Sequence, residues 1–313
     1  MQDRPLTLDH IFERAERLNP SKEVVTATAT GTERASYAEW AARTRRLAGV
    51  LDDLGVSADG RVATFAWNTG RHLELYFAAP CSGRVLHTLN IRLFPEQVTY
   101  IVNHAEDEVI FVDRSLLGLL GPLLPTFETV RHVVVMEDGG QAPDPEGVEL
   151  LDYERLLADA SPVEFHVTDE NRAASMCYTS GTTGNPKGVV YTHRSTFLHT
   201  MGVMLADAVG VCERDVVLPV VPMFHANAWG LAHAGVLREP EVVEHAAEPT
   251  GALRPLAIGA TLTPHGRGGD DLLVGEQALG PMEEVGQRER GVLHQALHDR
   301  VLLGTARGER PEA

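Results

Sequence analysis

Positive charge, and lysine in particular, is scarce in this chain of 313 residues. It contains 44 aspartates and glutamates against 27 lysines and arginines, which gives a formal net charge of −17. This excess of negative charge argues against nucleic acids and anionic membrane surfaces as partners. Only two lysines occur, Lys22 and Lys187, so arginine supplies nearly all of the positive charge. A lysine in such a sequence is a candidate for a specific role.

Long hydrophobic runs and paired cysteines are also missing. No run approaches the length of a membrane span, and the polar residues 1–10 give no secretory signal. The three cysteines form no C-x-x-C pair, which predicts small buried side chains in a reducing cytoplasm. The 14 histidines show no metal-ligand spacing. We therefore expect a cytoplasmic, globular protein with no integral membrane association and no histidine metal site.

Apolar segments of strand length alternate with segments of helical periodicity. A capping-box pattern at Ser36 and Glu39 predicts a helix that continues to Gly55. Strands that are almost continuously apolar and separated by helices predict an α/β fold with mainly parallel sheets flanked by helices on both faces. Further helices are expected over residues 70–79, 95–104 and 193–208, and strands over residues 61–67, 85–89, 108–112, 132–136, 174–178 and 216–221.

The clearest chemical signal is a glycine- and hydroxyl-rich segment, residues 178–188, which reads Tyr-Thr-Ser-Gly-Thr-Thr-Gly-Asn-Pro-Lys-Gly. Glycines let backbone amides approach a phosphate, the hydroxyls donate hydrogen bonds, and Lys187 adds positive charge. Ordinary surface loops have a similar composition, but the rare lysine favours a nucleotide-phosphate loop. The predicted phosphate-binding residues are Thr179, Ser180, Gly181, Thr182, Thr183, Gly184 and Lys187.

The spacing differs from that of a Walker loop, because Asn185 and Pro186 separate the last glycine from Lys187. It resembles instead the signature loop of the adenylate-forming enzymes, which include acyl-CoA synthetases, luciferases and the adenylation domains of peptide synthetases. The resemblance continues through residues 189–194. It implies that the loop wraps the β- and γ-phosphates of ATP and that Thr182 helps to hold Mg²⁺.

A second segment, residues 221–230, is similar to the substrate-pocket motif of medium- and long-chain fatty acyl-CoA synthetases. It reads Val-Pro-Met-Phe-His-Ala-Asn-Ala-Trp-Gly. With shorter similar segments upstream, the resemblance covers roughly residues 20–236. A histidine taken alone is more often structural, but the motif implies that Phe224 and His225 lie beside the carboxylate and the acyl-adenylate, and that Trp229 gates the fatty-acid tunnel. The implied substrate-binding residues are Phe224, His225, Ala226 and Trp229, and the implied catalytic residues are Lys187 and His225.

The resemblance implies the reaction of a fatty-acid–CoA ligase. Adenylation would convert a carboxylate into a mixed anhydride with AMP, which has a good leaving group, and coenzyme A would then form the thioester. The implied partners are small molecules, namely a fatty acid, ATP with Mg²⁺, and coenzyme A, and a homodimer is an open expectation. An adenylating enzyme for another carboxylate, such as an aryl acid, is the alternative within the family.

Residues 237–313 differ from the rest of the chain. The 3 tryptophans, 6 tyrosines and 9 phenylalanines all lie at or before Trp229, and no lysine follows Lys187. Linker-like stretches predict that residues 237–313 are a poorly ordered tail. The resemblance implies that residues 1–236 are a truncated N-terminal domain of the adenylate-forming fold. Two interpretations of the tail stay open: a divergent surface segment, or a change of reading frame near Leu237. Later tyrosine- and lysine-containing family motifs have no counterpart here, which suggests a catalytically incomplete ligase, with a non-catalytic nucleotide-binding protein or a decayed fragment as alternatives.

Overall fold

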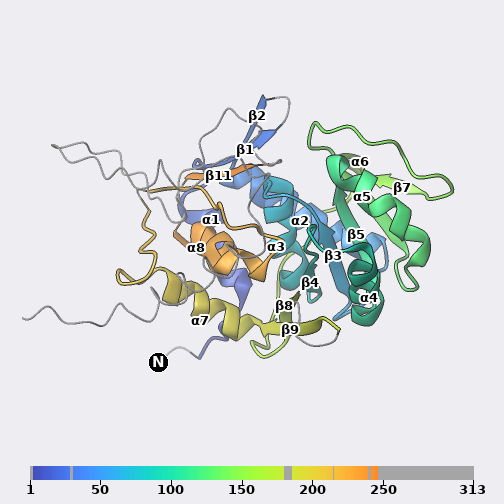
Figure 1. Cartoon of the computed structure of the whole chain (residues 1–313). Helices are drawn as coiled ribbons and strands as arrows, with labels where there is room; N and C mark the ends of the chain where they lie inside the picture. Colours follow the sequence, from blue (N-terminus) through green and yellow to red (C-terminus); the bar gives the residue numbers. More distant parts are fainter. Residues whose placement is uncertain (1–2, 29–30, 180–184, 214, 239–240, 246–313) are drawn as a thin grey trace, which may run out of the picture. The chain divides into compact units, whose positions relative to one another are not determined.

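The computed structural model describes residues 3–28, 31–179, 185–213, 215–238 and 241–245. Most of these residues surround a sheet with the strand order β7-β6-β5-β3-β4-β8-β9 (Figure 1). Neighbouring strands are parallel except for β8 and β9, which are antiparallel. The strands are β3 (Arg61–Phe65), β4 (Val85–Thr88), β5 (Asp107–Asp113), β6 (His132–Met136), β7 (Leu150–Asp152), β8 (Ala173–Thr179) and β9 (Lys187–Thr192).

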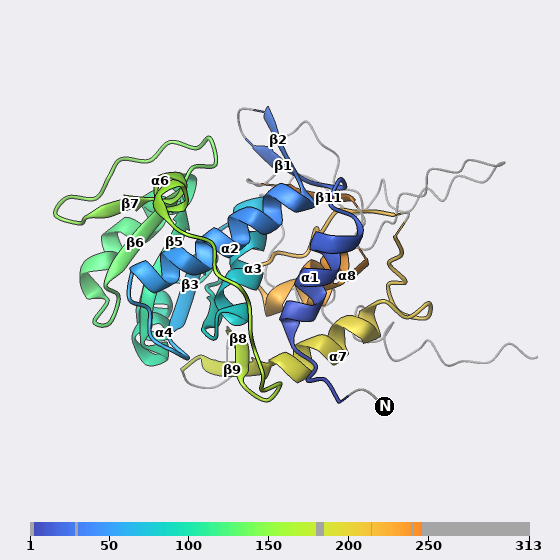
Figure 2. The same ribbon diagram turned by 180° about the vertical axis from the view of Figure 1, so that it is seen from behind.

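Helices cover both faces of this sheet, as the sequence predicts. One face packs on α1 (Leu8–Leu18), α2 (Tyr37–Asp53), α3 (Gly70–Cys81) and α6 (Tyr153–Asp159), and the other on α4 (Pro95–Ala105) and α5 (Leu117–Leu120). Figures 1 and 2 view the sheet from opposite sides, with α4 towards the viewer in the first and α2 in the second. The expected α/β fold is therefore confirmed, and the capping box between Ser36 and Glu39 does begin α2.

A smaller sheet has the order β10-β11-β1-β2. Its strands are β1 (Glu23–Thr28), β2 (Gly31–Ser36), β10 (Val216–Val217) and β11 (Glu241–His245). The strand expected over residues 216–221 was predicted too long. It ends at Val217 because Pro219 has no amide hydrogen to donate, and the segment that follows bonds to Asn68 instead.

The two remaining described α-helices are α7 (His193–Val203) and α8 (Leu231–Arg238), and short 3-10 helices span Arg114–Leu116, Gly121–Thr126 and Ala226–Gly230. The helix predicted over residues 193–208 ends early, because the amides of Val209 and Gly210 both turn back to the carbonyl of Val203 and Gly210 has a φ of +70°. Within the predicted tail, only the end of α8 and strand β11 are described, and the other residues of 237–313 lie outside the described part. No described helix is long and apolar enough to cross a membrane.

The cysteines are free, and Cys81 and Cys177 are buried as predicted. The prediction was wrong for Cys212, which is only partly buried. Cys212 lies in a tight turn, where its amide donates to the Asp215 carboxylate at 2.7 Å, and this turn keeps it near the surface.

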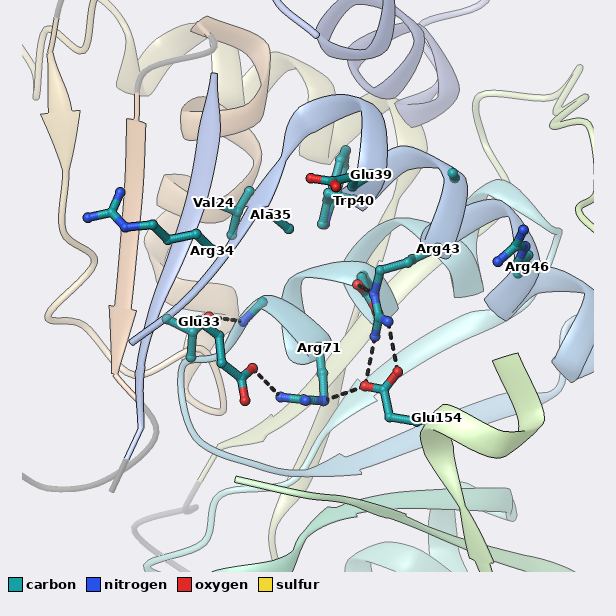
Figure 3. A pocket seen from close by; sticks show the side chains of 14 residues that line it. Val24, Glu33, Arg34, Ala35, Glu39, Trp40, Arg43, Arg46, Arg71 and Glu154 are labelled. Atoms are coloured by element: carbon teal, nitrogen blue, oxygen red, sulfur yellow. Dashed lines mark hydrogen bonds and ion pairs between the residues drawn. The ribbon is translucent and has the colours of Figure 1, made fainter. Parts of the chain in front are cut away.

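An ion-pair network ties α2, α3 and α6 together beside a groove of about 400 Å³ (Figure 3). Arg43 on α2 donates to Glu74 on α3 at 2.5 Å and to Glu154 on α6 at 2.7 Å. Arg71 donates to Glu154 at 2.9 Å and to Glu33 of β2 at 2.8 Å. None of the residues predicted to bind substrate or phosphate lines this groove, so we assign the network to stability.

Candidate active site

The predicted site segments meet at one edge of the main sheet, where its parallel strands have their carboxyl ends. Strands β3, β4 and β8 are neighbours in the sheet, so the residues that follow them share this edge. In open α/β sheets, ligands bind outside this edge. The segment 219–230 runs along it and is fastened to it by buried polar side chains.

Asn68, three residues beyond the end of β3, fastens the first part of that segment. Its side-chain amide donates to the carbonyls of Pro219, at 2.8 Å, and Val221, at 3.1 Å. Its side-chain oxygen accepts from the amide of Met223 at 2.7 Å. The Met223 carbonyl accepts in turn from the hydroxyl of Tyr76 on α3. These contacts determine the position of Phe224 and His225, and sequence reasoning assigned Asn68 no such role.

The strands on either side of the predicted phosphate loop are an antiparallel pair. Thr179, the last residue of β8, is the register partner of Lys187, the first residue of β9. Both side chains are exposed at the end of the pair. The other predicted phosphate-binding residues, Ser180, Gly181, Thr182, Thr183 and Gly184, lie outside the described residues, and the Mg²⁺ assignment of Thr182 lies there with them. Within the described residues, no group of three or more histidine, cysteine or acidic side chains could hold a metal ion.

Tyr178, which precedes Thr179 on β8, is held by contacts with side chains of other elements. Its hydroxyl lies 2.6 Å from Nδ1 of His104 on α4, and burial raises the pKa of Tyr178 to about 12. The ring also lies against the fully buried His87, whose Nδ1 is 2.8 Å from the carboxylate of Asp107. A side chain at Gly188 would meet the Tyr178 ring at 3.2 Å, which explains glycine at that position. The sequence offered no signal for this cluster, because its members come from four separate elements.

Phe224 and His225 point in different directions. Phe224 is 3% exposed and lies in the same apolar core as Tyr178, with its ring edge-on to Trp67 at 6.4 Å between centroids. The guanidinium of Arg92 lies 5.8 Å from the centre of the Phe224 ring. His225 is exposed, and its backbone amide donates to the Pro222 carbonyl at 3.0 Å. Of this predicted pair, His225 is the side chain that can reach a ligand outside the sheet edge.

The other two predicted substrate-binding residues, Ala226 and Trp229, come shortly after His225 in the sequence. Ala226 is half-buried, and its neighbour Asn227 donates to the hydroxyl of Ser175 on β8 at 2.8 Å. Trp229 is 43% exposed, and its carbonyl accepts from Nε2 of His199 on α7 at 3.1 Å. The strand that leads into the predicted phosphate loop therefore contacts the segment that carries His225 and Trp229.

The sequence of residues 12–240 matches the family described as AMP-binding enzyme. The chain belongs to this family. Relatives include the 3-methylmercaptopropionyl-CoA ligase of Ruegeria pomeroyi, 46% identical over 237 residues, and the long-chain-fatty-acid–CoA ligase of Thermus thermophilus, 48% identical over 239 residues. These alignments cover 75% and 76% of this chain but 44% and 42% of the two enzymes. The chain thus spans less than half the length of these relatives.

Crystal structures of other AMP-binding enzymes share the fold. A complex of an anthranilate CoA ligase with anthranoyl-AMP superposes with a TM-score of 0.68 over 79% of this chain and 47% of that enzyme, at 22% identity. A long-chain-fatty-acid-CoA ligase from Archaeoglobus fulgidus gives a TM-score of 0.67 at 22% identity and covers 79% of this chain and 49% of its own. At this identity the likeness supports the fold alone, and it confirms the adenylate-forming fold expected from the sequence.

Proposed function

We propose that this chain forms the ATP-phosphate and acyl-binding part of an acyl-CoA ligase, which adenylates a carboxylate and then transfers the acyl group to coenzyme A. The observation that carries the proposal is a meeting at one sheet edge. The strand that ends at Thr179 and the strand that begins at Lys187 meet there with the segment that carries His225 and Trp229. A carboxylate can attack a phosphorus of ATP only if the two are held side by side, and this arrangement suits that need.

Attack on ATP brings a carboxylate up to a polyanion, so charge must be neutralised. Backbone amides of the loop, the ammonium of Lys187 and Mg²⁺ would share this task. Lys187 begins β9, where its exposed side chain can turn back over the loop. Thr182 would ligate Mg²⁺ together with phosphate and water oxygens, the ligands this ion prefers. His225 would orient the carboxylate, and Trp229 would line the path of the acyl chain.

An aliphatic carboxylate is the substrate class we favour. The 3-methylmercaptopropionyl-CoA and long-chain ligases are 46% and 48% identical to this chain, whereas a benzoate–CoA ligase of Arabidopsis thaliana is 33% identical. The half-exposed indole of Trp229 offers apolar surface beside the sheet edge, as an alkyl chain needs. An aryl acid is the competing substrate class.

A second candidate is nucleotide binding without turnover. The family match ends at residue 240, and later family motifs have no counterpart in the 313 residues. Loss of preorganised groups of this kind typically costs about 10²–10³ in rate per group. Under this proposal residues 1–236 form the adenylation part and residues 237–313 an atypical tail. Translating the gene in its other two frames beyond codon 237 tests a change of reading frame, which is excluded if neither frame restores a family-like sequence.

The direct test is ATP–pyrophosphate exchange by the purified chain with octanoate, 3-methylmercaptopropionate and benzoate. Lys187→Ala should abolish carboxylate-dependent exchange. Lys22→Ala is a matched control, because Lys22 is the other lysine and its ammonium donates at 2.8 Å to the carbonyl of Glu213, which is not a predicted site residue. ATP binding without exchange would support the second candidate. Neither binding nor exchange by the folded chain would refute both.

A further inference from the structure

Residues 226–230 have an unusual backbone. Their φ values are +45° at Ala226, +50° at Asn227, +52° at Ala228, +53° at Trp229 and +77° at Gly230. Residues with side chains avoid this left-handed region at a cost of about 1–2 kcal/mol each, and they normally enter it singly. Four consecutive residues other than glycine keep this conformation only if the surrounding structure holds them there.

The side chain of Asn227 holds the turn against the main sheet. It is 7% exposed, and both ends of its amide are paired. Its nitrogen donates to the hydroxyl of Ser175 on β8 at 2.8 Å, and its oxygen accepts from the hydroxyl of Thr88, the last residue of β4, at 3.2 Å. Strands β4 and β8 are adjacent, with Thr88 in register with Cys177. One side chain thus joins the turn to two neighbouring strands.

The other side of the turn rests on α7. Besides the bond from His199 to the Trp229 carbonyl, Gly230 approaches this helix so closely that a side chain there would lie 2.6 Å from the His199 ring. Helix α7 directly follows β9, which begins with Lys187. The turn is therefore held between two elements. One is β8, which leads into the predicted phosphate loop, and the other is α7, which follows β9 on the far side of that loop.

We propose that Asn227 is a positioning residue, which sets the register of the segment carrying His225 and Trp229 against β4 and against β8, the strand that leads into the predicted phosphate loop. Its catalytic consequence rests on the function proposed above, but its structural consequence does not. Without the Asn227 amide, the hydroxyls of Thr88 and Ser175 lose their partner and the strained turn loses its attachment to the sheet. Trp229 then gains freedom, and its distance from Lys187 is no longer fixed.

The first experiment measures acrylamide quenching of Trp229 fluorescence in a Trp67→Phe background. There the only other tryptophan is Trp40, which is 1% exposed and shielded from the quencher. Asn227→Gly removes the attachment while tolerating the left-handed backbone, so the variant is not lost to strain. Ala228→Gly is the matched control, because it introduces the same residue into the same turn and keeps the Asn227 amide.

The Stern–Volmer constant of the Asn227→Gly variant should rise by up to about twofold, since Trp229, now 43% exposed as a residue, can become almost fully exposed. The Ala228→Gly constant should stay at that of the background. Ser175→Ala and Thr88→Val, which each remove one hydrogen bond, should give intermediate values. An unchanged constant in Asn227→Gly, or an equal rise in both glycine variants, would overturn the proposal.

This readout needs neither nucleotide nor turnover, so it decides the positioning role even if the chain shows no exchange activity. If exchange is present, Asn227→Gly should lower its rate at saturating substrate about tenfold or more and leave KM for ATP unchanged, because misplaced reactants react slowly although each still binds. A raised KM for ATP at an unchanged rate would contradict a role in register.

Discussion

Replacing Arg43 by methionine would leave a carboxylate inside the protein without its cation. Glu74 is 3% exposed, and its carboxylate accepts from Arg43 and from the hydroxyl of Tyr153. Breaking a buried pair by removing one partner costs about 3–5 kcal/mol. We expect a value near the lower limit, about 3 kcal/mol, because the Arg43 side chain is itself 30% exposed and water can partly replace it. Glu154 also loses Arg43 but keeps Arg71.

The loss of folding stability caused by Arg43→Met should depend on pH. Burial raises the pKa of Glu74 above its ordinary value of 4.5 even with Arg43 beside it. The folded protein therefore holds the Glu74 proton more tightly than the unfolded chain, so this group lowers stability as pH rises through the interval between the two pKa values. Without Arg43 the pKa of Glu74 rises further and the interval widens. The destabilisation of Arg43→Met should thus be larger near pH 8 than near pH 5.

Urea unfolding followed by circular dichroism measures both effects. Arg34→Met is the matched control, because it breaks an ion pair to Glu23 in which both side chains are about half exposed, and such pairs contribute about 1 kcal/mol or less. The double variant Arg43→Met, Glu74→Gln should recover part of the loss, since it removes the unpaired charge as well. Equal destabilisation by the single and double variants, with no dependence on pH, would refute this explanation of the network.

Three further predictions test the site and the core. Gly188→Ala should destabilise the protein by about 1–2 kcal/mol, because its new methyl group meets the Tyr178 ring; Gly118→Ala, with open space around it, should not, and thermal unfolding compares the two. Asn68→Ala should cost about 3 kcal/mol in urea unfolding, since three backbone groups lose their partner, and a loss below 1 kcal/mol would mean that water replaces the amide. Burial lowers the pKa of His233 from 6.5 to about 3, so the folded state binds fewer protons and stability should fall as pH drops below 6.5, by about 1.4 kcal/mol per pH unit for this group. His233→Gln should show a shallower decline in urea midpoint between about pH 7 and pH 5, and an unchanged slope would contradict the buried neutral form.

The main sheet could be predicted because its strands are apolar on both faces. Segments such as residues 108–112 and 132–136 have no polar side to place in water, so they indicate buried parallel strands without further information. Strand β9 was not predicted, because it is largely exposed and its pairing with β8 depends on the loop between them. The hairpin of β1 and β2 was missed for a similar reason, since β2 is mostly polar and exposed.

The candidate site was only half predictable. Residues proposed to face a ligand, such as Lys187 and His225, stand in continuous motifs, and a motif can be recognised in a sequence. Residues that hold those motifs in place are single polar side chains far away in the chain. The partners of Asn227 are 52 and 139 residues distant, and nothing local indicates such pairing. The motif gave no signal that the Phe224 ring lies in the core, and its contact with substrate stays a prediction.

Buried asparagines at the carboxyl edge of the sheet have a physical reason, because an irregular segment that crosses the strand ends must be held in place there. The helices cover the two faces with apolar contacts, which have no directional preference and cannot alone fix an irregular segment crossing the strand ends. A buried amide costs free energy unless its donor and acceptor are both paired, so it permits few arrangements. Asn68 and Asn227 are both more than nine-tenths buried, and in each the amide nitrogen and the amide oxygen are hydrogen-bonded. Asn68 holds the first part of the segment 219–230, and Asn227 holds its last part. The order of this segment therefore comes from two paired amides, and the side chains exposed between and beside them, above all His225 and Trp229, keep fixed positions while facing outward.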